Sequence, residues 1–261
     1  MKSLSLKLMT PVILSALLTA NSPAFAKHHG EKAGSMHVLT SETLTKSARS
    51  DKDKARDEGR KPAAVLNFLG VKAGNTVLDV LASSGWYSEV LSVAVGNRGK
   101  VLAHNTDFLL KMRDGANEKA ISARLADNRL PNVKRVDEEL TALTIADNSV
   151  DVAITGLNFH DVFNSFGEPA AIGFLAAIKA KLKPGGVFGV IDHVGNADGD
   201  NKSLHRMDPA LAVKAAKAAG FVVEAQGTML TNADDDHTQG VFGPALRGKT
   251  DRFVLKLRKP K

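Results

Sequence analysis

Two histidines with neighbouring carboxylates are the residues of this chain best suited to acid–base chemistry. His160 follows an apolar run and precedes Asp161, and His193 follows Asp192 at the end of a second apolar run. An imidazole has an unperturbed pKa of about 6.5, so it exchanges protons near neutral pH. The sequence therefore predicts His160 and His193 as catalytic residues, each a candidate general base.

Two further histidines lie on later loops of the chain, where function concentrates on a rigid scaffold. We expect His205, Asp236 and His237 to fold over the same region and to bind a substrate. The alternative is a divalent metal held by histidines with Asp192 or Asp236, because imidazole and carboxylate are borderline-hard ligands. No two histidines have the H-x-x-x-H spacing of a helical metal site, so no metal is predicted.

The run TVLDVLASSGWYSEVL at residues 76–91 predicts a place for a ligand to bind. A buried strand leads into a short turn, and an amphipathic helix begins near Trp86. The free N–H groups and the dipole of a helix N-terminus make such a turn a ligand shelf. Asp79 either binds the ligand or orders the turn. The residues expected to line the shelf are Asp79, Leu81, Ala82, Ser83 and Gly85.

Trp86 and Tyr87 are the only tryptophan and the only tyrosine in the chain. One of them could flank a planar ligand, so we predict a substrate-binding role for the pair. The alternative is that at least one packs against the sheet, as large aromatic rings commonly do.

The elements that must position these residues alternate between strand and helix. Such alternation predicts an α/β fold with a mostly parallel sheet covered on both faces. Right-handed crossovers then bring the loop ends of the first strands to one edge, where ligands bind. The strands are predicted at residues 76–81, 100–104, 133–136, 150–156, 187–192, 221–225 and 252–257. The helices are predicted at residues 62–69, 86–95, 108–126, 169–181 and 209–219.

The first 26 residues have the pattern of an export signal. Lys2 and Lys7 precede an apolar stretch that is too short to span a bilayer, and residues 24–26 form an A-x-A cleavage site. The mature chain is expected to begin at Lys27, in the periplasm or outside the cell, without stable membrane insertion; the alternative is an uncleaved anchor. Residues 27–55 are expected to form a tail and a helix, and residues 56–261 the α/β domain.

The composition of the chain excludes some kinds of site and disfavours one class of partner. The 261 residues include no cysteine, which excludes disulfides and thiolate metal sites. The formal charge of +7 is spread through the sequence and no basic run is interleaved with aromatics, so nucleic-acid binding is not expected. The oligomeric state is not predicted.

Three ordered motifs resemble those of the class I S-adenosylmethionine-dependent methyltransferases. They are VLDV at residues 77–80, ADNSVDVAITGLNFHDV at residues 146–162, and LKPGGVFGVIDH at residues 182–193. More narrowly, RDEGRKPAAVLNFLGVKAGNTVLDV, GWYSEVL, SLHRMD, ADDDHT and RGKTDRFVLKLRKP are similar to a family of predicted, often exported proteobacterial methyltransferases. The resemblance implies a Rossmann-like fold with seven strands, the last antiparallel. It also implies S-adenosylmethionine as cofactor and a small-molecule methyl acceptor.

The resemblance also implies roles for individual residues. Asp79 and the turn after it would meet the cofactor, Asn105 would meet its ribose, and Asn158 would lie beside the methyl group. Asp137 and Glu138 would meet the adenine amino group.

The turn departs from the family pattern, because only Gly85 remains of its usual glycines. A residue with a side chain at positive φ costs about 1 kcal/mol. The lost glycines and the export signal leave an alternative function, a non-catalytic exported binding protein on the same fold. An NAD-dependent oxidoreductase is disfavoured because no G-x-G-x-x-G follows the first strand.

Overall fold

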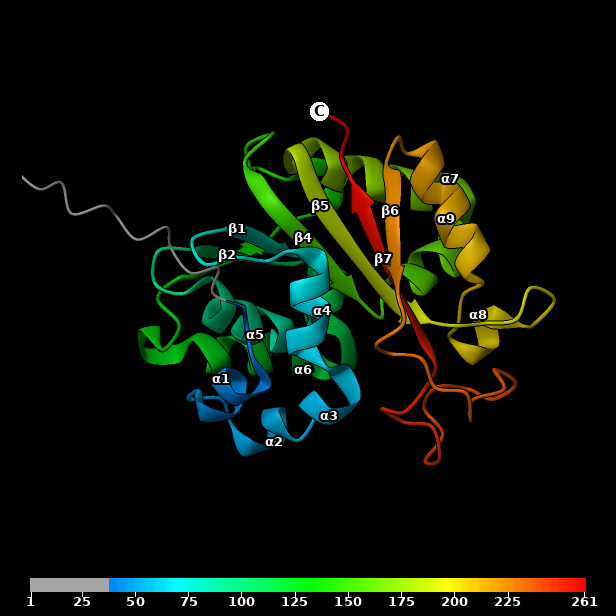
Figure 1. Cartoon of the computed structure of the whole chain (residues 1–261), viewed down its shortest axis with the longest axis horizontal. Helices are drawn as coiled ribbons and strands as arrows, with labels where there is room; N and C mark the ends of the chain where they lie inside the picture. Colours follow the sequence, from blue (N-terminus) through cyan, green and yellow to red (C-terminus); the bar gives the residue numbers. More distant parts are fainter. Residues whose placement is uncertain (1–37) are drawn as a thin grey trace, which may run out of the picture. The chain divides into compact units, whose positions relative to one another are not determined.

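A seven-stranded sheet forms the centre of the molecule in the computed structural model, which describes residues 38–261 (Figure 1). The strand order is β3-β2-β1-β4-β5-β7-β6. All pairs are parallel except those of β7, which runs antiparallel to β5 and to β6. The strands are β1 (Thr76–Asp79), β2 (Lys100–Asn105), β3 (Val133–Asp137), β4 (Val150–Gly156), β5 (Leu182–His193), β6 (Val222–Gly227) and β7 (Arg252–Arg258).

The strand order reverses beside β1, which pairs with β2 on one side and with β4 on the other. Such a switch point opens a crevice outside the carboxyl ends of the strands. The predicted fold, a Rossmann-like methyltransferase sheet with an antiparallel last strand, is confirmed. The export signal, its cleavage site and most of the predicted tail lie outside the described residues.

Helices cover both faces of the sheet because neighbouring strand residues point to opposite sides. Val77 packs with the helices α4 (Pro62–Leu69) and α5 (Trp86–Val95), whereas Leu78 packs with α7 (Phe159–Lys181) and α9 (Pro209–Ala218). The longer helices are α4 (Pro62–Leu69), α5 (Trp86–Val95), α6 (Asp107–Leu125), α7 (Phe159–Lys181) and α9 (Pro209–Ala218). The shorter ones are α1 (Ser41–Lys46), α2 (Asp51–Lys54), α3 (Asp57–Arg60), α8 (Asn201–Leu204), η1 (Ala126–Asn128) and η2 (Leu140–Ala142).

Helix α7 begins earlier than the sequence predicts. A helical segment follows β4 directly from Phe159, and the chain is interrupted at Gly167, with φ 83° and ψ 174°. The predicted helix from Pro169 is the second half, since proline fits the first turn of a helix. The earlier half matters for function because it places His160 and Asp161 at the carboxyl end of β4.

The N-terminal segment of the domain lies against the start of α5. Trp86 Nε1 donates a hydrogen bond to the Asp53 carbonyl at 3.1 Å, which ties α2 to that helix. None of the helices among residues 38–261 is long and apolar enough to cross a membrane.

Candidate active site at the carboxyl edge of the sheet

The turn after β1 keeps the backbone path that glycines normally provide. Leu81, Ser83 and Gly85 all have positive φ, at 56°, 52° and 75°. The side chain of Leu81 packs against the core on one side of the sheet, and that of Ala82 packs with the small cluster around Ile121. These two side chains are therefore half-buried, each packed against a hydrophobic cluster.

Two buried residues of β2 hold this turn in place. Asn105 Oδ1 accepts from the Ser83 backbone N–H at 2.7 Å, and its Nδ2 donates to the Ser83 carbonyl at 3.2 Å. His104 Nδ1 accepts from the Leu81 N–H at 3.3 Å, and its Nε2 lies 2.9 Å from the Glu138 carbonyl. Burial lowers the pKa of His104, so the ring is neutral and donates through Nε2. Sequence reasoning missed His104.

Asp79 is buried at the end of β1. Its Oδ2 accepts a hydrogen bond from Ser88 Oγ at 2.6 Å. Burial raises the pKa of Asp79 to about 7, against the opposing effects of the Ser88 hydrogen bonds and of Arg60 and Arg124. The carboxyl group therefore connects β1 to α5 and titrates near neutral pH.

Arg124 of α6 closes the far side of the turn. Its Nε donates to the Ser84 carbonyl at 2.8 Å, and its Nη1 pairs with Asp53 at 2.8 Å and with the buried Glu89. A Cβ on Gly85 would lie 3.2 Å from the Arg124 Cδ, so a glycine suits this position. Arg124 lies in a polar helical stretch, and the sequence offered no signal for its role.

Trp86 and Tyr87 belong to the core between α5 and the sheet. The Trp86 ring is 2% exposed and has the guanidinium of Arg60 at 4.6 Å from its centroid. A Cβ on Gly156 would approach the Tyr87 ring to 3.0 Å, so that glycine makes room for the ring. Burial raises the pKa of Tyr87 to about 12. Both rings take the packing alternative, and their substrate-binding role stays a prediction.

The acidic residues after β3 are engaged with nearby groups. Asp137 is exposed and pairs with Arg135 Nε at 2.8 Å. Glu138 accepts from the Thr144 N–H at 2.7 Å and from its hydroxyl at 2.6 Å. These contacts order the loop after β3, and the predicted adenine contact of either residue stays a prediction.

Asn158 links the end of β4 to the turn after β1. Its Nδ2 lies within hydrogen-bonding distance of the Leu81 carbonyl at 3.3 Å and of the Gly156 carbonyl at 3.0 Å. The structure thus brings Asn158, the turn and Asp79 to one edge of the sheet, as the sequence predicts. Whether Asn158 also contacts a ligand stays a prediction.

His160 is buried against Asp192 at the end of β5. Asp192 Oδ1 accepts from His160 Nδ1 at 2.7 Å, and Asp192 Oδ2 accepts from the His160 backbone N–H at 2.7 Å. Burial opposes charging of His160, but Asp192 and Asp161 outweigh it and raise the pKa of the ring to about 10. At neutral pH this imidazole carries its proton, which argues against its predicted role as a general base.

His193 differs from His160 although the two ring centroids are only 5.9 Å apart. Its Nδ1 lies 2.7 Å from Thr250 Oγ1, in a buried hydrogen bond. Burial and the nearby charge of His160 lower the pKa of His193 to about 3, against the effect of Asp192. His193 is therefore neutral at physiological pH and a weak base.

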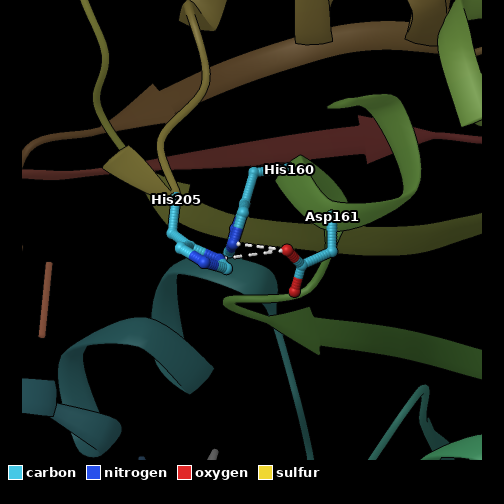
Figure 2. A group of neighbouring side chains, drawn as sticks. All are labelled: His160, Asp161 and His205. Carbon is cyan, nitrogen blue, oxygen red and sulfur yellow. Dashed lines mark hydrogen bonds and ion pairs between the residues drawn. The ribbon is translucent and has the colours of Figure 1, made fainter. Parts of the chain in front are cut away.

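The later loops bring one of the two remaining predicted histidines to His160. His205 Nδ1 lies 3.3 Å from Asp161 Oδ1, and the ring centroids of His205 and His160 are 5.6 Å apart (Figure 2). His205 has φ 54° and ends α8. The neighbouring Arg206 is fully buried and forms two hydrogen bonds with Asp235, at 2.8 and 3.0 Å.

His237 and Asp236 have other partners. His237 Nε2 lies 2.9 Å from Asp251 Oδ2, and its Nδ1 lies 3.2 Å from Asn196 Oδ1. Asp236 is exposed and accepts from the Thr238 N–H and hydroxyl. His237 fastens its loop to Asp251 and Asn196, whereas the Asp236 carboxylate orders its own loop. The substrate-binding role of both residues stays a prediction.

A surface pocket of about 360 Å³ lies away from this edge. Gly99, Lys100, Asn132 and Val133 are among its lining residues. Lys100 and Val133 are the first residues of β2 and β3, so the pocket lies at the amino ends of these strands. The convergent polar groups are at the carboxyl ends, which are the better candidate site.

Comparison with known proteins connects this arrangement to one fold. No protein-family model matches the chain. A demethylmenaquinone methyltransferase from Staphylococcus aureus is 32% identical over 123 residues, which are 47% of this chain and 45% of that protein. The match thus spans about half the length of the curated relative.

Solved structures match over more of the chain. A SAM-dependent methyltransferase from Aquifex aeolicus has a TM-score of 0.58 at 21% identity and covers 84% of this chain and 98% of its own. A putative sarcosine dimethylglycine methyltransferase from Galdieria sulphuraria has a TM-score of 0.56 at 15% identity, over 87% of this chain and 94% of its own. With the strand order and the switch point beside β1, these likenesses establish that the chain has the Rossmann-like fold of class I S-adenosylmethionine-dependent methyltransferases.

Proposed function

We propose that this protein is an S-adenosylmethionine-dependent methyltransferase that acts on a small-molecule acceptor. One observation carries the proposal: the turn after β1 has positive φ at Leu81, Ser83 and Gly85, while the half-buried side chains of Leu81 and Ala82 pack against core clusters. The backbone path of a nucleoside-binding turn is thereby kept without most of its glycines. The partial match to a curated methyltransferase supports the same reading.

The residues at this edge suit the parts of the cofactor. The free N–H groups at the start of α5 and the carboxyl of Asp79 favour polar and charged groups of a bound amino acid. The Arg60 guanidinium lies over the rings of Trp86 and Tyr87, and its charge opposes the rise in the pKa of Asp79 that burial causes. It offers a cation for the carboxylate of a bound amino acid. The side chains of Asn105 and Glu138 are engaged with Ser83 and Thr144. Recognition of ribose and adenine would therefore use backbone groups or require these side chains to change partners.

Methyl transfer requires little covalent chemistry from the protein itself. S-adenosylmethionine supplies an electrophilic methyl group on a sulfonium, and transfer is an in-line displacement by the acceptor. The main contribution of the chain is to hold the acceptor in line near β4 and β5. Because His160 holds its proton and His193 is a weak base at neutral pH, these rings are better suited to orienting an acceptor than to deprotonating it.

Calorimetric titration with S-adenosylmethionine and with S-adenosylhomocysteine tests the proposal. Ser83 offers a matched pair of variants, because its φ of 52° suits glycine. Ser83→Gly should bind the cofactor at least as tightly as the wild type. Ser83→Phe adds a bulky ring to the turn and should weaken cofactor binding by at least tenfold. NAD is the control ligand, which neither the wild type nor either variant should bind.

Absence of heat with either ligand at millimolar concentration would contradict the proposal and favour the non-catalytic binding protein. So would equal affinity of Ser83→Phe and the wild type, because the ligand would then bind away from the turn. Mass spectrometry of the native protein under non-denaturing conditions gives a second readout, a co-purified adenosyl compound.

We also infer that the protein is exported to the periplasm or beyond. The basic start, the apolar stretch and the A-x-A site in the first 26 residues support this location. N-terminal sequencing of protein from fractionated cells should give a chain that begins at Lys27. A chain in the cytosolic fraction that retains Met1 would contradict it.

A further inference from the structure

The start of α7 and the end of α8 bring three potential metal ligands together. His160 and Asp161 follow β4, and His205 ends α8. One ligand atom from each residue lies within 4.8 Å of the other two. Figure 2 shows the two imidazoles together on one side of the Asp161 carboxylate, with a dashed line from each ring to the same oxygen.

The spacing of these atoms suits a single ion. Asp161 Oδ1 lies 3.1 Å from His160 Nε2 and 3.3 Å from His205 Nδ1. Two ligand atoms that each lie about 2.1 Å from one ion are about 3.0 Å apart in an octahedral site and about 3.4 Å apart in a tetrahedral site. The two distances to Asp161 already fall in this interval. The third distance, between the two histidine ligand atoms, is at most 4.8 Å, and rotation of the half-buried His205 side chain would shorten it.

His160 supplies an independent sign of an additional ligand. Its ring is 3% exposed, yet Nε2 makes no hydrogen bond within residues 38–261. Asp161 Oδ1 lies 3.1 Å from Nε2 and forms an ion pair with the charged ring, but the contact does not meet the geometry of a hydrogen bond. A buried ring nitrogen without a hydrogen-bond partner calls for an explanation such as an ion.

Asp192 prepares His160 for this role. Because Asp192 accepts from Nδ1 at 2.7 Å, the proton that a metal ion displaces from the charged ring is the one on Nε2, which faces Asp161 and His205. A carboxylate behind a metal-binding histidine fixes its tautomer, its orientation and its basicity. Asp192 also accepts from the backbone N–H groups of His160 and His193, at 2.7 and 2.8 Å, so its own position is well defined.

We propose that His160 Nε2, Asp161 and His205 Nδ1 bind a divalent transition-metal ion, with Asp192 as the supporting carboxylate. Two imidazoles and one carboxylate select borderline ions such as Zn²⁺, Co²⁺ or Ni²⁺ over Mg²⁺ and Ca²⁺. Three protein ligands leave at least one coordination position for an oxygen donor. Asp161 is exposed and His205 half-buried, so the ion and a further ligand have a route from solvent.

The position of the metal site at the ends of β4 and β5 indicates a role in binding a substrate. It lies at the sheet edge that carries the turn after β1, and the exposed Phe242 packs edge-on against His205 with centroids 4.9 Å apart. A substrate with an anionic or chelating oxygen could bind the ion while its apolar part contacts Phe242. The metal site itself does not depend on the proposed methyltransferase activity.

Metal titration of the full chain, purified without a histidine tag and freed of metal by a chelator, tests the proposal. Co²⁺ is followed by its visible d–d absorption and Zn²⁺ by calorimetry. Because His28 and His29 lie outside the described residues and could also bind metal, every titration is repeated in a chain with both replaced by alanine. We expect one ion per chain in both backgrounds.

Two variants remove a metal ligand, a third changes the supporting carboxylate, and a fourth removes a comparable histidine elsewhere. His205→Gly and Asp161→Asn should each weaken binding at least tenfold, and Asp192→Asn should weaken it about tenfold through His160. His237→Gly is the matched control, since His205 and His237 both have positive φ, at 54° and 65°. It should leave the affinity for the ion within about threefold of the wild type.

Circular dichroism establishes that each variant is folded. If His205→Gly does not fold, Asp161→Asn still tests the site, because it keeps the size and exposure of the native side chain. Zn²⁺ should raise the melting temperature of the wild type and of His237→Gly only, because an ion that binds the native state stabilises it. Absence of binding, binding that survives His205→Gly and Asp161→Asn, or binding lost with His28 and His29 would each overturn the proposal.

Discussion

Asn105 holds Ser83 by both ends of its amide, accepting from the Ser83 N–H at 2.7 Å and donating to its carbonyl at 3.2 Å. The asparagine is fully buried at the end of β2, and Ser83 has a positive φ of 52°. The amide therefore satisfies two backbone groups of a strained turn with one side chain. A carboxylate could accept the first hydrogen bond but could not donate the second.

This relationship predicts that Asn105→Asp destabilises the protein. The replacement brings a buried negative charge against the Ser83 carbonyl and leaves that carbonyl without its donor. We expect the free energy of unfolding to fall by about 1–3 kcal/mol, with a larger loss at higher pH as the carboxyl ionises. Urea denaturation measures the change. The exposed Asn97→Asp is the control and should alter stability by less than about 0.5 kcal/mol; equal effects of the two variants would refute the role of the buried amide.

Asp79 predicts a pH dependence of stability. Burial raises its pKa in the folded protein from 3.8 to about 7. The stabilising contribution of the protonated carboxyl is complete below about pH 4 and is lost as the pH rises toward 7. Asp79→Asn keeps an oxygen that can accept from Ser88 and does not titrate, so its stability relative to the wild type should increase by a few kcal/mol between pH 4 and pH 8.

The measurement is a pair of urea titrations at each pH, with the exposed Asp198→Asn as control. A stability difference between Asp79→Asn and the wild type that stays constant with pH would mean that Asp79 ionises normally. Cofactor titration of the same variant at pH 7 separates this effect from any contact that Asp79 makes with a ligand.

The fold could be predicted because its signals are local and periodic. The alternation of apolar strand and amphipathic helix around Val77 and Leu78 reflects burial on both faces of a parallel sheet. Trp86 begins α5 and Gly156 ends β4, as predicted. The early half of α7 was missed because Pro169 gives a stronger start signal than Phe159, and the non-helical Gly167 separates the two halves with a kink.

The candidate site could be predicted only in part. The carboxyl edge of the sheet brings His160 and Asp192 together, because His160 follows β4 and Asp192 lies at the end of the parallel neighbour β5. It could not place His205 beside Asp161, since that contact depends on the left-handed residue that ends a four-residue helix. Neither periodicity nor spacing could identify Arg124, because a charged residue on a polar helix is ordinarily solvated. Its partners, Asp53 and Glu89, come from segments far away in the sequence.

Arg124 predicts a link between the turn and the N-terminal segment that Trp86 can report. Arg124→Gln removes the charge opposite the buried Glu89 and the ion pair with Asp53. Glu89 keeps its ion pair with Arg129, and Asp53 keeps the one with Arg56. We therefore expect a loss of about 1–3 kcal/mol in unfolding free energy, which corresponds to the lost hydrogen bonds between charged groups. As the sole tryptophan, Trp86 should also become more accessible to acrylamide when the segment around Asp53 loosens.

Fluorescence quenching and urea denaturation of the same samples measure both effects. Arg98→Gln changes an exposed arginine and should leave both unchanged. A variant at Arg124 that loses stability without any change in quenching would show that the charge matters to α5 and α6 but does not hold the N-terminal segment.

The ion pair between Arg206 and Asp235 should contribute strongly to the loop framework that carries His205. Both side chains are fully buried, and the guanidinium also donates to the carbonyls of Val194 and Gln239. Arg206→Met fills similar space but leaves the Asp235 charge without its partner, so we expect a loss of about 3–5 kcal/mol. Lys214→Met is the matched control, because Lys214 pairs with Glu168 at 3.1 Å with its side chain 66% exposed; it should cost less than about 1 kcal/mol. Chemical denaturation at neutral pH compares the two, and a cost for Arg206→Met as small as that of the surface variant would mean that the loops do not depend on this pair.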